Sequence, residues 1–180
     1  MSYILVTNDD GVQAPGILAL AQAMRSLGDI RVIAPASNQS ASGHKKTLFT
    51  DIPIQNVKMA DGTPATAVSG SPSDCVALAA LGVLEGAIDG VPAVAVSLDN
   101  GQADRVEDYR VAAQIAVSIV RRVLEKGLPP FTILNLNIPA LPAVPEIRLT
   151  RQGIRVYADQ LAREGDICQI VGDPPGGLTD

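Results

Sequence analysis

Two adjacent carboxylates, Asp9 and Asp10, stand between an apolar run and Gly11 near the start of this 180-residue chain. Neighbouring carboxylates repel each other, so keeping both ionised away from bulk water is costly unless a cation lies beside them. Oxygen ligands favour magnesium, manganese or calcium over zinc. The pair therefore indicates a site for a hard divalent cation. A second interpretation fits the pattern equally well: one aspartate caps a helix that begins near Pro15, and the other is solvated.

A second stretch that could carry chemistry is the polar loop at residues 36–46. It contains the serines Ser40 and Ser42 and the single histidine of the chain, His44. The surroundings do not match the GxSxG pattern of a hydrolase nucleophile, so a serine–histidine triad is disfavoured. His44 is either a loop histidine with a local hydrogen bond or a contact for an anionic substrate.

Two common nucleotide-binding motifs are excluded at the first strand. The sequence DDGVQAPG lacks the GxGxxG glycines of a dinucleotide fingerprint. Gly11 and Gly16 have the spacing of a P-loop, but Ile17 and Leu18 replace the required lysine and hydroxyl residue. A phosphate bound here therefore needs another device, such as a metal ion.

The candidate residues follow the ends of two predicted strands. Residues 3–7 and 30–35 are apolar runs typical of strands buried on both faces. Between them, helical spacing links five apolar residues: Ile17, Leu20, Ala21, Met24 and Leu27. A strand–helix–strand unit makes the two strands parallel neighbours, and their carboxyl ends then lie at one edge of the sheet. We therefore expect the Asp9–Asp10 pair and the 36–46 loop to converge.

The rest of the chain continues the alternation of strands and helices. Strand-like content covers residues 47–59, 63–68, 91–98 and 131–139, and helices are expected from about residue 73 and over residues 106–126. Ser71 or Ser73 is the predicted N-cap of the first of these helices. This order predicts an α/β, doubly wound fold, with a mostly parallel sheet and helices on both faces. We assign residues 1–145 to the α/β domain and 146–180 to a more polar C-terminal extension.

Composition sets further limits. Hydrophobic residues make up 47% and charged residues 18% of the chain, enough for one sizeable core. The net charge of -5 gives no basic footprint for duplex nucleic acid or an anionic membrane. No leader pattern or membrane-length apolar run is found, which predicts a cytoplasmic protein. Cys75 and Cys168 fit no CxxC pattern and are predicted to be reduced thiols.

Six motifs in order give the chain a family resemblance. They are ILVTNDDGVQAPGI, VIAP followed by NQSASGH, GSPSDCVALA, GVPAVAVSL, ILNLNIP and TRQG. Through them the chain resembles the survival protein SurE family of metal-dependent nucleotidases. The resemblance implies a Rossmann-like α/β domain that hydrolyses nucleoside monophosphates, as a 5'- or 3'-nucleotidase, with manganese or magnesium. It also implies a homodimer or homotetramer, assembled partly through the C-terminal extension.

The same resemblance implies roles for particular residues. Asp9 and Asp10 would be the catalytic metal ligands, and Ser40 would supply a hydroxyl ligand. Asn8, Gly43 and His44 would lie beside the substrate phosphate. Attack on phosphorus by a metal-activated water is the expected mechanism, with an aspartyl-phosphate on Asp9 as the alternative.

The chain departs from the family pattern at two places. Family members carry a further strand ending in SGxN and a glycine-rich loop, whereas here ALAALGVLEGAIDGVPAVAV runs straight across that place. The asparagine that would complete the metal site is absent. The junctions near residues 84–85 and 177–178 resemble excisions. Either residues are missing from the sequence as read, or the chain is truly shortened. Two other functions follow as alternatives: a broad acid phosphatase that also attacks polyphosphate, and a nucleotide-binding protein without catalysis.

Overall fold

The computed structural model divides the chain into two compact units, residues 1–144 and 145–180. It describes residues 3–39, 47, 49–83, 92–130, 132–140 and 146–150, together with the backbone of strands 154–156, 159–164, 167–172 and 176–178. The two units are described separately below.

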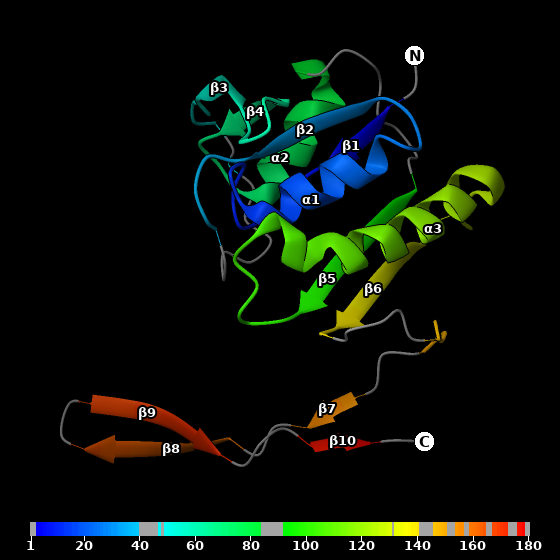
Figure 1. Cartoon of the computed structure of the whole chain (residues 1–180). Coiled ribbons are helices and arrows are strands. Elements are labelled where there is room, and N and C mark those ends of the chain that lie inside the picture. Colours follow the sequence, from blue (N-terminus) through cyan, green and yellow to red (C-terminus); the bar gives the residue numbers. More distant parts are fainter. Residues whose placement is uncertain are drawn as a thin grey trace. The chain divides into compact units, whose positions relative to one another are not determined.

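A four-stranded sheet forms the centre of the first unit (Figure 1). Its strands are β1 (Ile4–Val6), β2 (Ile30–Pro35), β3 (Ile54–Lys58) and β4 (Pro64–Val68), in the order β1-β2-β4-β3. β1, β2 and β4 run parallel, and β3 pairs antiparallel with β4. The prediction that the first two strands are parallel neighbours is confirmed.

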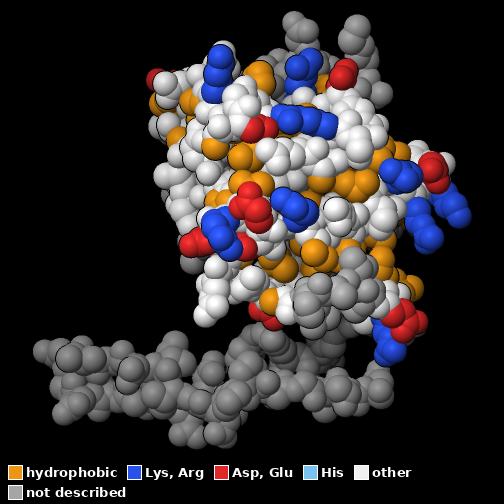
Figure 2. Space-filling view, in the orientation of Figure 1, with side chains coloured by type: hydrophobic (Ala, Val, Ile, Leu, Met, Phe, Trp, Pro, Cys, Tyr) orange, Lys and Arg blue, Asp and Glu red, His pale blue; other side chains and the backbone are white. Residues whose placement is uncertain are grey.

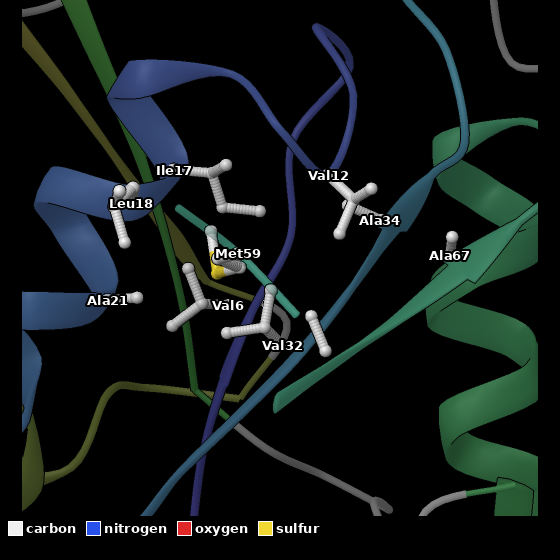
Figure 3. Close-up of a cluster of buried hydrophobic side chains, with 10 residues drawn as sticks. Val6, Val12, Ile17, Leu18, Ala21, Val32, Ala34, Met59 and Ala67 are labelled. Atoms are coloured by element: carbon white, nitrogen blue, oxygen red, sulfur yellow. The ribbon is translucent and has the colours of Figure 1, made fainter. Parts of the chain in front are cut away.

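Helix α1 (Pro15–Met24) connects β1 to β2 and covers one face of this sheet. Pro15 suits the first helical position, because its missing N–H would have no partner there. The helix buries Ile17, Ala21 and Met24 of the predicted apolar stripe, whereas Leu20 is half-buried and Leu27 lies beyond the end of the helix. Figure 3 shows Ile17, Leu18 and Ala21 in a buried cluster with side chains of the sheet. The cluster includes Val6, Val12, Ile17, Leu18, Ala21, Val32, Ala34, Met59 and Ala67. This core fixes α1 against the strand that precedes Asp9 and Asp10.

Helix α2 (Pro72–Leu78) lies on the opposite face and continues as a π-helical turn, η1 (Ala79–Val83). Ser71 is its N-cap, which settles the choice that the sequence left open. Its inward face joins a second buried cluster, which contains Ile33, Val68, Cys75 and Ala79. Successive side chains of β2 therefore pack into clusters on opposite faces of the sheet, as expected of a strand buried on both sides.

A second parallel pair completes the first unit. β5 (Ala93–Asp99) pairs with β6 (Ile133–Pro139), and the 3₁₀ turn η2 (Val106–Tyr109) leads into α3 (Arg110–Lys126) between them. α3 packs on β5 and against α1. The fold is thus the predicted α/β arrangement of mostly parallel strands with helices. Among the described residues, no ladder joins β5 to β1.

The second unit consists of two antiparallel pairs. β7 (Ile154–Val156) pairs with β10 (Gly176–Leu178), and β8 (Asp159–Glu164) pairs with β9 (Ile167–Gly172). The sequence analysis did not predict these strands, because their polar residues show no clear alternation. In the part of the chain that is described, no helix is long and apolar enough to cross a membrane.

One carboxylate ties the end of α1 to the turn between β3 and β4. Asp61 accepts hydrogen bonds from the Thr63 N–H (2.9 Å) and hydroxyl, Gln22 Nε2 (3.1 Å) and Arg25 Nη2 (3.2 Å). The hydrogen bond from the Thr63 hydroxyl contributes most to holding the pKa of Asp61 well below its usual range, and the other bonds add to this effect. The turn therefore depends on an ionised Asp61.

We expect Asp61→Asn to lower the free energy of unfolding by about 1–2 kcal/mol at pH 7, because a charged acceptor is lost. Because the pKa of Asp61 is lower in the folded than in the unfolded state, ionised Asp61 stabilises the fold fully above the unfolded-state pKa of about 4. This stabilisation is lost as the pH falls towards the pKa of the folded state. The difference between wild type and variant should therefore shrink from pH 7 to pH 3. Urea unfolding followed by circular dichroism measures it. An equal difference at both pH values would contradict the assignment.

Candidate functional site

The residues after β1 form a tight turn that the side chain of Asn8 holds. Asn8 Nδ2 donates to the carbonyl oxygen of Gly11 (3.0 Å), and the Gly11 N–H donates to Asn8 Oδ1 (3.2 Å). Asp9 and Asp10 lie between these two residues, and both are exposed. The turn thus presents two neighbouring carboxylates to solvent at the carboxyl end of β1.

This turn packs closely on the loop that follows β2. The Val12 N–H donates to the carbonyl oxygen of Pro35 (2.8 Å), and the Gln39 N–H donates to that of Asp9 (2.7 Å). Gly11 has a φ of +107°, and a Cβ added to it would lie 3.2 Å from the carbonyl carbon of Ser37. The predicted convergence of the two segments is confirmed as far as Gln39.

A cavity of about 240 Å³ opens beside the two carboxylates. The end of β1, the first turns of α1, the second half of β5 and the start of α3 line it. One wall contains Thr7, whose buried Oγ1 has no hydrogen-bond partner among the described residues. A ligand in this cavity could therefore find one free hydroxyl next to Asp9 and Asp10.

Tyr109 also lines the cavity, where η2 meets α3. Its ring lies so close to Gly16 that a Cβ added there would be 3.1 Å from the ring, and its hydroxyl donates to the carbonyl oxygen of Ala103 (3.1 Å). Burial, followed by the charge of Asp10, raises the pKa of the Tyr109 phenol. The residue is therefore a neutral aromatic wall within electrostatic reach of Asp10.

The carboxylate pair has the donor chemistry of a magnesium or manganese site. Magnesium is commonly held by one or two carboxylates, with water and substrate phosphate completing its ligands. In the described part of the chain, no group of three or more His, Cys, Asp or Glu residues is placed to hold a metal ion. Two exposed neighbouring carboxylates match the part of such a ligand set that a protein supplies.

The alternative role for the pair, capping the following helix, is not observed. The N-cap of α1 is Ala14, and no side chain donates to or accepts from the backbone at this cap. Neither Asp9 nor Asp10 therefore caps the helix. Their exposure instead makes both carboxylates accessible to a ligand.

Three of the six predicted site residues are brought together, since Asn8, Asp9 and Asp10 line one cavity. Ser40, Gly43 and His44 lie outside the described residues, so their roles stay predictions. Sequence reasoning missed Thr7, Ser97 and Tyr109 as cavity residues. Only Ser97 carried a signal, as a polar residue inside an apolar strand.

Comparison with known proteins gives one family for two overlapping stretches of the chain. The family model described as Survival protein SurE matches residues 4–84 and 81–159. The "5'-nucleotidase SurE" of Chloroflexus aggregans is 40% identical over 195 residues, covering 88% of this chain and 76% of the relative. The "5'-nucleotidase SurE" of Herpetosiphon aurantiacus is 37% identical over 196 residues, covering 91% of this chain and 76% of that relative.

A solved structure shows the same likeness in three dimensions. The crystal structure of the SurE protein from Aquifex aeolicus superposes with a TM-score of 0.75 at 28% sequence identity. The similarity covers 95% of this chain and 82% of that chain.

The alignments also locate a difference from these relatives. The alignment with the Chloroflexus protein is 195 residues long but uses only 88% of this 180-residue chain, so the relative has residues without a counterpart here. The two family matches meet at residues 81–84, next to the predicted junction at 84–85. The connection from α2 to β5 is thus where the family pattern is interrupted.

We expect Gly11→Ala to lower the free energy of unfolding by about 1–3 kcal/mol, because both its positive φ and its contact with the Ser37 backbone disfavour a Cβ. Gly62→Ala is the matched control, since Gly62 has a φ of +84° but no atom within 4 Å of an added Cβ. Urea unfolding of both variants separates the contact from the backbone strain. An equal loss in the two variants would show that the close approach at Gly11 contributes nothing.

Proposed function

The chain belongs to the survival protein SurE family, and from this membership we propose that it hydrolyses nucleoside monophosphates to nucleoside and phosphate. We assign manganese or magnesium as the cofactor, held by the carboxylates of Asp9 and Asp10. The observation that supports this most is the exposed carboxylate pair beside a cavity, on a turn that two hydrogen bonds of the Asn8 side chain hold. Ser40 is proposed as a further ligand through its hydroxyl.

Each described residue has a separate task in this proposal. Asp9 and Asp10 hold the cation, which, when bound, polarises a phosphoryl oxygen and lowers the pKa of water. Asn8 shapes the turn next to the phosphate, because its amide is engaged by Gly11. The Thr7 hydroxyl, which has no hydrogen-bond partner among the described residues, can donate to an oxygen of the ligand. Gly43 and His44 are proposed beside the phosphate from the family resemblance.

The cavity wall supports a direct hydrolytic route. Apolar side chains of Ile17, Leu20, Val96 and Leu98 face this cavity beside the polar turn, which limits the bulk water around the phosphate. Phosphoryl transfer depends mainly on positioning and electrostatic stabilisation, so no covalent nucleophile is required. The alternative is an aspartyl-phosphate on Asp9. Phosphate label retained on acid-quenched protein would support that alternative.

Charge distribution is compatible with a small substrate. On the face of the first unit shown in Figure 2, acidic and basic side chains are interspersed rather than gathered by sign. A nucleic-acid groove is typically lined by one continuous basic stripe. We therefore favour a free mononucleotide over a polymer as substrate. The cytoplasmic location and the homodimer or homotetramer stay predictions.

We expect metal-dependent release of inorganic phosphate from a nucleoside 5'-monophosphate, abolished by chelator. Asp10→Asn should lower turnover about 100-fold or more, because the cation supplies several kcal/mol and each 1.4 kcal/mol is tenfold in rate. Asp29→Asn, an exposed aspartate that precedes β2 at its other end, is the control and should keep full activity. Unchanged turnover in Asp10→Asn would refute the assignment.

The two alternative functions are separated by substrate and by binding. A broad acid phosphatase should hydrolyse aryl phosphates and short polyphosphates at rates close to those for nucleotides. The interrupted family pattern at residues 81–84 favours the second alternative, a nucleotide-binding protein without turnover. This second alternative would be established if calorimetry detected nucleotide binding by protein that releases no phosphate. Against both alternatives, we expect phosphate release, with nucleoside monophosphates hydrolysed faster than aryl phosphates and polyphosphates.

A further inference from the structure

Tyr109 brings an aromatic ring to the cavity that opens beside Asp9 and Asp10. The chain has three tyrosines, two phenylalanines and no tryptophan, so aromatic rings are rare in it. Of the described residues that line this cavity, Tyr109 alone is aromatic. It is half-buried, so part of its surface is open to a ligand. A rare residue type thus borders the space next to the carboxylate pair.

The ring of Tyr109 is held in place from several sides. Its hydroxyl donates to the carbonyl oxygen of Ala103 (3.1 Å). The ring atoms Cδ1, Cε1 and Cζ lie so close to Gly16 that an added Cβ would be between 3.1 and 3.4 Å from them. Its backbone ends η2, which packs against α1, and is the N-cap of α3. A ring that is fixed in advance loses little conformational entropy when a ligand packs on it.

The lining of the cavity combines a charged turn with an apolar surface. The charged side chains, Asp9 and Asp10, belong to the turn after β1. Helices α1 and α3 contribute apolar side chains to the lining: Ile17, Leu20, Ala112 and Ala113. A nucleoside monophosphate has the same division, because its phosphate is charged whereas its base offers an aromatic face. With the phosphate at the carboxylate turn, the base is left to the part of the lining that the helices and Tyr109 form.

Few side chains of the cavity are available to read the edge of a base. The Asn8 amide and the Tyr109 hydroxyl each donate to a backbone carbonyl. The carboxylate pair is assigned to the cation, and Thr7 to the phosphate. Among the described residues that line the cavity, Ser97 is the remaining polar side chain. Recognition of the base through its face is therefore favoured over recognition of its edge.

We propose that Tyr109 is a specificity-determining residue of the site, on whose ring the base of a nucleoside monophosphate stacks while the phosphate lies at Asp9 and Asp10. This inference rests on the proposed function, because it needs a mononucleotide at that pair. Every base has a face that can stack on an aromatic side chain. Purine and pyrimidine nucleotides are therefore both substrates, and the larger purines bind more tightly.

Substrates with and without a base separate stacking from general damage to the site. Tyr109→Leu should raise KM for adenosine 5'-monophosphate by about 10-fold, the usual effect of losing one base–aromatic stack. KM for ribose 5-phosphate, which has no base, should stay at its wild-type value. We expect kcat to be unchanged for both substrates, because stacking on a remote part of the substrate is equal in the ground state and the transition state. Steady-state phosphate release with manganese present measures all four constants.

Three further variants control for the loss of the ring. Tyr109→Phe keeps the ring without the bond to Ala103, and should have the wild-type KM for adenosine 5'-monophosphate. Tyr3→Leu removes a tyrosine whose ring lies beside Arg31, at the other end of β1, and should leave KM unchanged for both substrates. Gly16→Ala displaces the ring in a helix that favours alanine over glycine, and should raise KM for the nucleotide alone.

The comparison of the two substrates decides the proposal. An unchanged KM for adenosine 5'-monophosphate in Tyr109→Leu would overturn it, and so would an equal rise for ribose 5-phosphate. If Tyr109→Leu does not fold, Gly16→Ala decides by the same comparison. A preference for purines over pyrimidines that is the same in wild type and Tyr109→Leu would also overturn it.

This proposal and the proposed function fail in different ways. Wild-type protein that binds adenosine 5'-monophosphate but releases no phosphate refutes the proposed function. Calorimetry of the nucleotide and of ribose 5-phosphate, on wild type and Tyr109→Leu, then still decides the role of Tyr109. Wild-type protein that hydrolyses both substrates with equal KM refutes the role of Tyr109 alone. Wild-type protein that neither binds nor hydrolyses the nucleotide refutes both.

Discussion

The close approach of the Gly11 backbone to the loop after β2 is the contact on which the rest of the site depends. Two backbone hydrogen bonds form at this contact, from the Val12 N–H to the carbonyl oxygen of Pro35 and from the Gln39 N–H to that of Asp9. Because Gly11 has no Cβ, the turn can follow the loop at this distance. The carboxylate pair and Gln39 are therefore placed by one backbone contact.

Carboxylates serve two opposite purposes around this contact. Asp74 and Asp61 accept several hydrogen bonds each, and their charges hold turns together. Asp9 and Asp10 are exposed on a turn that the Asn8 side chain and the backbone hold through hydrogen bonds of their own. Both carboxylates are exposed, so a ligand in solvent can reach them. This division separates an exposed pair from carboxylates of the same residue type that hold turns.

Local chemistry explains which features could be predicted from the sequence. The ends of β2 follow from a continuous apolar run. The N-cap at Ser71 follows from the serine–proline start of α2, and the buried face of α1 follows from the helical spacing of its apolar residues. Thr7 and Tyr109 could not be identified, because their position in the cavity depends on packing between distant segments. The strands of the second unit were missed since neither their length nor their polarity pattern differs from a loop.

The family pattern is interrupted where the chain passes from one parallel ladder to the other. β1 ends one ladder and β5 ends the other, and the two family matches meet at residues 81–84, in the connection from α2 to β5. Among the described residues, no strand pairs with the outer edge of β1, and Thr7 Oγ1 has no hydrogen-bond partner. The cavity beside Asp9 and Asp10 is lined from both ladders, by the residues after β1 and by β5. The shape of the candidate site therefore depends on the packing of α1 against α3, because these helices lie on the two ladders.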